Sequence, residues 1–312
     1  MAFTHIPVLF EEAMEGLAVK EDGVYLDATF GRGGHSRGIL ERLGPDGRLY
    51  AIDRDPEAVA AAAEIKDPRF AIAHAEFRDL QRVCADFGIA GRLDGILMDI
   101  GVSSPQIDDA SRGFSFDRDG PLDMRMDPQC GRTAADIVNG ESREELRRIF
   151  HDYGEERFSA KIAAAIVHDR EKAPFETTLQ LASLIARVVP GPENGRNKAT
   201  RCFQALRIAV NGELDELSQA LEQSAGVLRS GGRLCVISFH SLEDRIVKNF
   251  IKKSSRGAEF PKGLPVTAEA AEKMRLATAT MEPVGGPVKA SKEECAANAR
   301  SRSATLRVAR RL

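Results

Sequence analysis

Two features of the sequence have residue types and a spacing that suit chemistry: a glycine-rich segment and an aspartate that follows it. Residues 27–35 read Asp-Ala-Thr-Phe-Gly-Arg-Gly-Gly-His, and Asp53 stands twenty residues after Gly33. Glycines such as Gly33 and Gly34, between a strand and a helix, let backbone N–H groups approach a ligand closely. A carboxylate at the position of Asp53 can accept both hydroxyls of a ribose. The pair predicts a nucleoside site without fixing the reaction, because dinucleotide dehydrogenases and S-adenosylmethionine enzymes share it.

Three aspartates narrow the choice of ligand. Asp27 lies inside the first predicted strand, and Asp53 and Asp99 lie at the tips of the second and fourth, so all three are expected near one edge of the sheet. Such a cluster repels a pyrophosphate but suits a ligand with a sulfonium and an ammonium group, and Asp27 is the predicted partner of the cationic amino-acid moiety. The dehydrogenase fingerprint also requires a glycine where this chain has Ser36. S-adenosylmethionine is therefore favoured over a nicotinamide dinucleotide, although a single aspartate in such a place can also serve only to cap a strand end.

A short polar loop, Ser103-Ser104-Pro105-Gln106, follows Asp99. Methyltransferases that act on the amino groups of bases often carry a similar proline-containing loop at this point. The N4 lone pair of cytosine is delocalised into the ring, so acceptors that hold its N–H bonds can turn that lone pair towards a sulfonium methyl group. No strong general base is required, because the methylated amine, still protonated, is very acidic. We predict that Ser103, Ser104 and Pro105 position the substrate; the alternative is that the serines only shape a turn.

Three further side chains are candidates for the same edge of the sheet. Phe77, at the end of the third predicted strand, is placed to pack on an adenine face, or else belongs to the core. His35 follows the glycines and can bind through its backbone N–H, so its imidazole need not be catalytic. His240, at the end of the fifth predicted strand, either hydrogen-bonds the substrate or caps a helix.

Short apolar strands that alternate with helical segments must position these residues. Predicted strands cover residues 24–30, 48–53, 70–77, 94–100 and 233–239, and two late strands, over 278–284 and 305–309, are expected to be antiparallel. Helices follow the first three strands and the fifth, the last of them over residues 241–252. This alternation predicts an α/β fold with a doubly wound, mostly parallel sheet.

A helical insertion interrupts the alternation. Residues 101–132 are rich in Gly, Pro, Asp and Ser, and apolar helix faces follow: one after Ser142, one that Pro190 ends, and one over residues 203–221 that reads as a single long helix. We therefore predict a cofactor-binding domain from residues 1–106 and 211–312, and a substrate-recognition domain from residues 107–210.

Composition excludes several classes of protein. With 43% hydrophobic and 29% charged residues, the chain is too apolar for a disordered protein. No apolar run approaches the roughly 18 residues of a membrane span, and the first residues lack the basic start of a secretory signal, so we expect a cytoplasmic protein. The five cysteines form no C-x-x-C pair and the six histidines show no ligand spacing, so no metal site is predicted. Nothing in the sequence assigns an oligomeric state.

Charge gives a local rather than a global indication of a nucleic-acid partner. The net charge is −3, but residues 285–312 hold seven Lys or Arg against two Glu. Residues 187–207 hold five basic residues, Arg187, Arg196, Lys198, Arg201 and Arg207, against Glu193. Either segment suits contacts with phosphates, and either can equally be an ordinary solvated surface.

Taken together, these motifs resemble the family of ribosomal RNA small subunit methyltransferase H, the MraW/RsmH family of bacterial cytosine-N4 methyltransferases. The resemblance spans nearly the whole chain without an obvious departure in the signature motifs. Those motifs are HIPVL (5–9), ATFGRGGHS (28–36), AIDRDP (51–56), DIGVSSPQ (99–106), RGFSF (112–116), DGPLDMRMD (119–127), YGEERF (153–158), FQALRIAVNGEL (203–214), FHSLEDRIVK (239–248) and RSRSATLRVA (300–309).

The resemblance implies a class I, Rossmann-like methyltransferase that uses S-adenosyl-L-methionine to methylate a decoding-centre cytidine of 16S rRNA in the assembled small ribosomal subunit. It places Asp123, Arg125 and Asp127 in the loop that enters the insertion, and it implies neither a metal nor a membrane. Assigning Asp27 to the ligand comes from the chemistry and not from the family. The cofactor-binding residues that it implies are Gly33, Gly34, His35, Asp53, Phe77, Asp99 and Gln106.

Three other functions remain possible from the residues alone. The first is an S-adenosylmethionine enzyme that acts on DNA or a small molecule, since only the partner of the insertion would differ. The second is a nicotinamide oxidoreductase, which Ser36 and the aspartates disfavour. The third is a non-catalytic ribosome-binding factor, which the intact glycine segment and polar loop disfavour.

Overall fold

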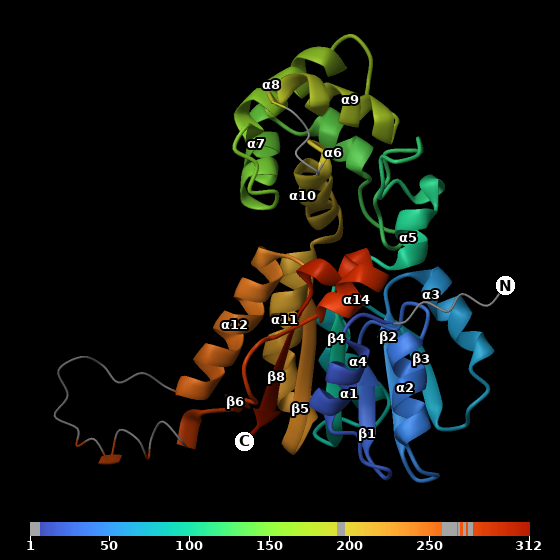
Figure 1. The fold of residues 1–312 in the computed structure, drawn as a ribbon, viewed down its shortest axis with the longest axis vertical. Helices are drawn as coiled ribbons and strands as arrows, with labels where there is room; N and C mark the ends of the chain where they lie inside the picture. Colours follow the sequence, from blue (N-terminus) through green and yellow to red (C-terminus); the bar gives the residue numbers. More distant parts are fainter. Residues whose placement is uncertain (1–6, 192–196, 258–266, 268, 271–272, 274–276) are drawn as a thin grey trace. The chain divides into compact units, whose positions relative to one another are not determined.

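The computed structural model describes residues 7–191, 197–257, 267, 269–270, 273 and 277–312 (Figure 1). His5, Ile6, Glu193 and Arg196, which the sequence analysis named, lie outside these residues. The chain divides into two compact units: the first unit is Met1–Gly101 with Leu214–Leu312, and the second unit is Val102–Glu213. The boundaries predicted from the sequence fall after residues 106 and 210.

One sheet organises the first unit, and its order among the described residues is β3-β2-β1-β4-β5-β8-β6, with β7 paired to β8. Strands β1 to β5 are parallel where they pair, and β8 is antiparallel to β5, β6 and β7. The predicted α/β class and its antiparallel late strands are confirmed. The strands are β1 (Val24–Asp27), β2 (Arg48–Asp53), β3 (Phe70–His74), β4 (Leu93–Asp99), β5 (Leu228–Ser238), β6 (Met281–Pro283), β7 (Val288–Lys289) and β8 (Thr305–Arg311).

Helices cover both faces of this sheet, as a doubly wound fold requires. Strand residues alternate between two cores: Leu26 and Ile96 pack with apolar residues of α4, α11 and α12, whereas Tyr25 and Leu97 pack with those of α1 and α2. This period of two is what a strand buried on both sides produces. The helices are α1 (Phe10–Leu17), α2 (Gly34–Arg42), α3 (Pro56–Ala61), α4 (Leu80–Asp86), α11 (Glu213–Val227), α12 (Ser241–Arg256) and α14 (Lys292–Ala297). Short 3₁₀ turns are η1 (Ala62–Glu64), η2 (Phe77–Asp79) and η4 (Ala299–Ser303).

The second unit is helical and has a core of its own. Leu146, Phe150, Ile162 and Leu181 are fully or almost fully buried in it. Ser142 begins α7 by accepting a hydrogen bond from the Glu145 N–H, as its sequence position predicted. The elements are α5 (Ser104–Asp108), η3 (Ala110–Arg112), α6 (Ala134–Gly140), α7 (Arg143–Asp152), α8 (Ser159–Arg170), α9 (Thr178–Val188) and α10 (Thr200–Asn211).

Three sequence predictions about elements are wrong, the first being the strand predicted over residues 24–30, which ends at Asp27. The single long helix predicted over residues 203–221 is two helices, α10 and α11, because Gly212 adopts φ 61° and ends α10 in the left-handed conformation. The third strand ends at His74 rather than at Phe77, because the side chain of Glu76 caps a 3₁₀ turn that starts with Phe77.

No helix in the described part of the chain is long and apolar enough to cross a membrane. Within the same residues, no group of three or more His, Cys, Asp or Glu side chains is placed to hold a metal ion.

Candidate functional site

The three predicted aspartates meet at one edge of the sheet. Asp27 ends β1, the middle strand of three, and its Cα pairs with Ala51 of β2 on one side and Leu97 of β4 on the other. Asp53 and Asp99 stand two residues beyond those partners, at the carboxyl ends of β2 and β4. The charge of Asp27 raises the pKa of both neighbours. The structure therefore brings together the carboxylates that the sequence placed at successive strand ends.

Asp53 supports the glycine segment. Its Oδ2 accepts a hydrogen bond from the Gly31 N–H at 2.8 Å, and its Oδ1 accepts one from the Asp55 N–H at 2.8 Å. Burial raises its pKa to about 6, against these two bonds, which lower it. Each carboxylate oxygen has two acceptor positions, so both oxygens of Asp53 retain one for a ligand hydroxyl.

Asp99 has an oxygen that the protein does not satisfy. Its Oδ1 is buried and has no hydrogen-bond partner in the part of the chain that the structure describes. Its Oδ2 lies 3.7 Å from Nδ1 of His35, too far for a hydrogen bond. Burial, followed by the charges of Asp27 and Glu243, raises its pKa to about 8. A buried acceptor without a partner costs stability, so this site suits a ligand that brings a charged donor.

Asp27 is the most enclosed of the three, with 1% of its surface exposed. It accepts hydrogen bonds from Ser36 Oγ at 2.6 Å and from the Thr29 N–H at 3.0 Å. Burial raises its pKa in spite of these bonds. Ser36, which the sequence analysis used against a dehydrogenase, therefore ties helix α2 to strand β1.

The glycine segment forms a tight turn into α2. Gly33 has φ 73° at the N-cap of the helix, and a Cβ there would lie 2.7 Å from the ring of Phe30. A Cβ on Gly34 would lie 2.4 Å from Pro7. The Gly33 N–H already donates to the Phe30 carbonyl at 2.7 Å, whereas Gly34 and His35 open the helix, where N–H groups have no partner within the helix. The N–H groups of Gly34 and His35 therefore have no partner within α2.

The His35 side chain is buried and stacks on Phe10, with ring centroids 5.9 Å apart. Burial lowers its pKa to about 4, so the imidazole is neutral near neutral pH. A neutral, buried ring supports the prediction that His35 acts through its backbone rather than as an acid or a base.

Ion pairs hold Phe77 where it starts the 3₁₀ turn. Arg78, the next residue, contacts Glu216 of α11 at 2.5 Å and Glu76 at 2.6 Å, and Glu76 also pairs with Arg54. Phe77 is half-buried against the core beneath the sheet. The sequence gave no reason to expect these ion pairs beside Phe77.

His240 caps α12, which is the alternative that the sequence had left open. Its Nδ1 accepts a bond from the Glu243 N–H at 3.5 Å, and its Nε2 lies 3.0 Å from a carboxylate oxygen of Glu243. Glu243 is fully buried and also accepts from the Phe239 N–H at 2.7 Å. Sequence analysis missed Glu243, although its position three residues after His240 is the spacing of a capping box.

The polar loop lies in the second unit and begins α5. Ser103 is the N-cap: its side chain accepts from the Gln106 N–H at 3.5 Å, and the Gln106 side chain accepts from the Ser103 N–H at 2.9 Å. Ser104 and Pro105 are half-buried, and Gln106 is buried. The loop is thus a defined capping box, with Pro105 near the helix start, where its missing N–H costs little.

The loop that enters the second unit is held by its own charges. Arg125 donates to both oxygens of Asp123, at 2.8 and 2.7 Å. Asp127 accepts from the Gln129 N–H at 2.9 Å. Arg112, buried, donates to the carbonyl of Met126 at 2.8 Å.

Much of the basic segment from residue 187 to residue 207 is already paired. Arg187 forms an ion pair with Asp169, and Arg207 donates to both oxygens of Glu213 at 2.8 Å. Arg201 is exposed and donates to the carbonyl of Glu155. Among the described arginines of this segment, Arg201 is the one that forms no ion pair with a carboxylate, so it is the better candidate for a phosphate contact.

Comparison with known proteins gives the family. Residues 2–312 match the MraW methylase family. The chain belongs to this family. It is 54% identical over 311 residues to ribosomal RNA small subunit methyltransferase H of Shewanella halifaxensis, which covers 99% of this chain and 98% of the relative. It is 54% identical over 309 residues to the protein of the same name from Idiomarina loihiensis, covering 99% and 97%.

Solved structures are more distant. An rRNA methylase from Streptococcus thermophilus has a TM-score of 0.43 and 9% sequence identity, with 99% of each chain covered. A likeness at that level carries no argument about this chain.

As a member of the MraW methylase family, the chain uses S-adenosylmethionine as its cofactor. The residues at the sheet edge fit this molecule. A cationic ligand can pair with Oδ1 of Asp99, which has no partner among the described residues, and with the other two carboxylates, and a ribose can donate to the remaining acceptor positions of Asp53. A pyrophosphate is an anion and offers these carboxylates neither a cation nor a hydrogen-bond donor. The site therefore does not favour a nicotinamide dinucleotide.

Proposed function

We propose that this MraW-family methylase transfers a methyl group to the exocyclic N4 amino group of a decoding-centre cytidine in 16S rRNA, within the assembled small ribosomal subunit. The observation that carries the proposal is the cluster of three carboxylates, in which Oδ1 of Asp99 has no partner among the described residues; this cluster suits a cationic methyl donor. The names of the relatives support rRNA as the substrate class. A cytoplasmic location follows from that substrate.

In this proposal the first unit holds the cofactor. Asp53 accepts the ribose hydroxyls, Asp99 and Asp27 face the amino group, and Phe77 packs on the adenine. The N–H groups of Gly34 and His35, at the start of α2, hold the carboxylate of the amino-acid moiety, and Gly33 provides the turn that exposes them. The cofactor, when bound, supplies an electrophilic methyl group.

The second unit then recognises the RNA, and its polar loop positions the base. Ser103, Ser104 and Pro105 hold the N–H bonds of the cytosine amino group and orient its lone pair for attack, and the resemblance assigns Gln106 to the cofactor. Positioning and electrostatics supply most of the rate, because the methylated amine loses its proton readily. His240 reaches substrate only if it leaves Glu243, so its part is to fix the start of α12.

The test is nucleoside mass spectrometry after incubation with isotopically labelled S-adenosylmethionine. Small subunits and naked 16S rRNA, both from cells that lack this enzyme, are compared side by side. Labelled N4-methylcytidine, chiefly from intact subunits, is the expected result. Label in DNA or in small molecules, or no label while the cofactor still binds, would reject the proposal.

A further inference from the structure

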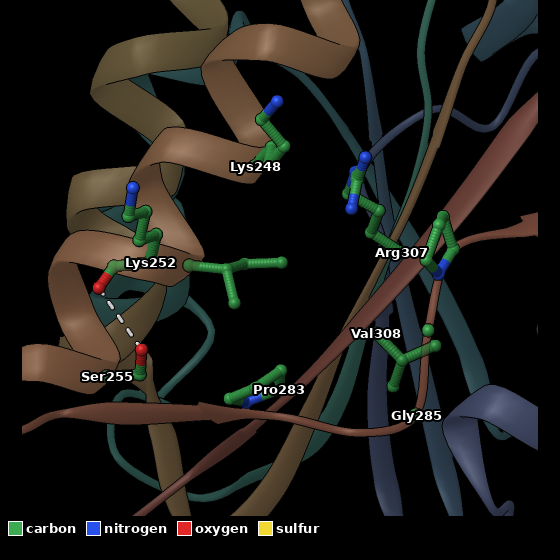
Figure 2. Close-up of a pocket in the computed structure, with 10 residues that line it drawn as sticks. Lys248, Lys252, Ser255, Pro283, Gly285, Arg307 and Val308 are labelled. Carbon is green, nitrogen blue, oxygen red and sulfur yellow. Dashed lines mark hydrogen bonds between the residues drawn. The ribbon is translucent and has the colours of Figure 1, made fainter.

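A cavity in the first unit lies apart from the three aspartates, between α12 and the antiparallel strands (Figure 2). Its volume is about 250 Å³. Helix α12 contributes one wall, and β6, β8 and the turn between β6 and β7 contribute the others. It is lined by Lys248, Ile251, Lys252, Ser255, Pro283, Gly285, Gly286, Pro287, Arg307 and Val308.

The rim of this cavity is cationic. Lys248 and Lys252 are four residues apart on α12 and therefore share one face of the helix. Both are exposed, and neither ammonium has a hydrogen bond or an ion pair within the described residues. Figure 2 shows Lys248 extending from the helix towards the side of the cavity that carries Arg307. Two ammonium groups are thus available to anions.

The wall of the cavity formed by the strands adds the positively charged, planar guanidinium group of Arg307. Arg307 donates to both oxygens of Asp244, at 2.7 and 3.0 Å, and 18% of its side chain is exposed. Asp244 is also within electrostatic reach of Lys289 and Lys248. Glu282, next in the chain to the lining residue Pro283, is paired with Arg310. The cavity lining holds Lys248, Lys252 and Arg307, and because Asp244 is paired with Arg307, the two lysines leave the local charge positive.

The floor of the cavity is apolar and open to a flat group. Ile251, Pro283, Pro287 and Val308 contribute to the lining. Gly286 has no atom within 4 Å of the position of a Cβ, so the glycine wall leaves space beside the backbone. The volume lies below the roughly 300–1,000 Å³ of pockets for drug-sized ligands, so one small ring system fits better than a dinucleotide.

We propose that this cavity binds one unpaired nucleotide of the RNA substrate, with its base on the apolar floor beside Arg307 and its flanking phosphates on Lys248 and Lys252. The inference rests on the proposed function, because it takes RNA as the substrate. Unpaired RNA bases stack on guanidinium planes and apolar side chains, while lysines bind the backbone. Lys248 lies seven residues into α12, about 10 Å along a helix that begins at the cofactor edge of β5. The cavity would therefore anchor RNA on the first unit itself.

Neutralising Lys248 and Lys252 tests whether their charges bind RNA phosphates. We expect the Lys248→Gln and Lys252→Gln double variant to bind a fluorescent single-stranded RNA decamer about tenfold more weakly. The slope of log affinity against log salt should fall by roughly 1.4, for two lost phosphate contacts. The matched control is Lys253→Gln with Arg256→Gln, which removes the same charge from α12 at exposed positions outside the cavity. Equal effects of the two double variants, or none from the first, would overturn the inference.

A tryptophan introduced at the cavity tests whether an RNA base binds there. The chain contains no Trp, so Gly286→Trp places a single indole at the cavity. Gly286 does not have a positive φ, and space is open there, so the substitution is tolerated by the backbone. Addition of the decamer should quench this fluorescence, and inorganic phosphate at equal phosphate concentration should not. Quenching by neither or by both would contradict a base in the cavity.

Two further readouts separate this inference from the proposed function. If the lysine variant loses affinity for small subunits but not for the decamer, the partner is a ribosomal protein and the RNA inference fails. If wild-type protein labels no cytidine but the lysine variant still loses RNA affinity, the proposed reaction fails while the cavity assignment stands. Cofactor affinity should be unchanged in every cavity variant.

Discussion

Strand β4 carries two aspartates five positions apart, and their surroundings differ. Asp94, near the start of the strand, is buried and accepts hydrogen bonds from Lys20 Nζ at 3.3 Å and from the Val24 N–H at 3.1 Å, and it also pairs with Arg229. Asp99, at the other end, has no cation beside it and one oxygen without a partner in the described chain.

The comparison separates a structural carboxylate from one built for a ligand. At Asp94 the protein supplies the countercharges itself, so folding alone satisfies the group. At Asp99 one acceptor oxygen has no partner among the described residues, which costs free energy. A cationic donor can recover that free energy on binding. The edge at the carboxyl ends of parallel strands is also where ligands of open α/β sheets bind.

Among variants at the sheet edge where the three aspartates lie, Asp53→Ala should have the largest effect on cofactor affinity. We expect the cofactor to bind about 100-fold more weakly, or about 2.7 kcal/mol, because two ribose hydroxyls lose a charged acceptor. Isothermal titration calorimetry measures this. Asp53→Asn is the control: it keeps the oxygen that Gly31 needs and should lose less. Near-wild-type affinity in Asp53→Ala would remove Asp53 from the cofactor site.

Asp94→Asn should have the next largest effect, and on stability instead of binding. We expect the free energy of unfolding to fall by about 2 kcal/mol, because a buried carboxylate with three partners is lost. The melting temperature should drop by roughly 4–8 °C in calorimetry. Cofactor affinity should not change. A loss of cofactor affinity as large as that in the Asp53 and Asp99 variants would contradict the distinction between the two ends of β4.

Asp99 should make cofactor binding depend on pH. Without ligand its carboxyl keeps a proton up to a pH near its pKa of about 8, and a cationic ligand binds the ionised form. Binding should therefore release a proton, and affinity should rise about fivefold between pH 7 and pH 8. Asp99→Asn should bind about tenfold more weakly at pH 8 and lose that part of the dependence. The same dependence in the variant would assign it to another group.

The raised pKa of Asp99 also predicts how the stability of the protein changes with pH. Between the ordinary aspartate pKa, about 4, and the native value, the native state holds a proton that the unfolded chain has lost. The free energy of unfolding of the cofactor-free protein should therefore fall as the pH rises through this range. Chemical denaturation at several pH values should show a shallower fall in Asp99→Asn than in the wild type.

Phe77→Leu should have the smallest effect, about threefold weaker cofactor binding, because an aliphatic side chain keeps most of the contact but loses the ring face. Phe87→Leu is a matched control. Phe87 packs against the same core and against Tyr50, with the ring centroids 4.8 Å apart and the rings tilted by 43°, so its loss should lower stability and spare the cofactor. Equal affinity losses in the two variants would return Phe77 to the core.

Much of the fold could be read from local patterns. Strand β2 has the predicted bounds, and the antiparallel late strands pair as expected, because apolar runs between turn residues are short-range information. The prediction failed where one residue decides between conformations of similar cost. Gly212 ends a helix whose apolar face continues across it, and Glu76 turns the chain before Phe77.

By itself, the sequence determined the chemical types at the site: the glycine turn, the aspartates at successive strand ends and the family motifs. Spacing along a strand sets which edge a residue reaches, and that needs no knowledge of distant contacts. Only the tertiary structure decided which polar groups are satisfied. It gives Asp94 its partners from Lys20 and Arg229, and it leaves Oδ1 of Asp99 without a partner among the described residues. Burial and hydrogen bonding depend on residues far apart in the chain, so no local pattern records them.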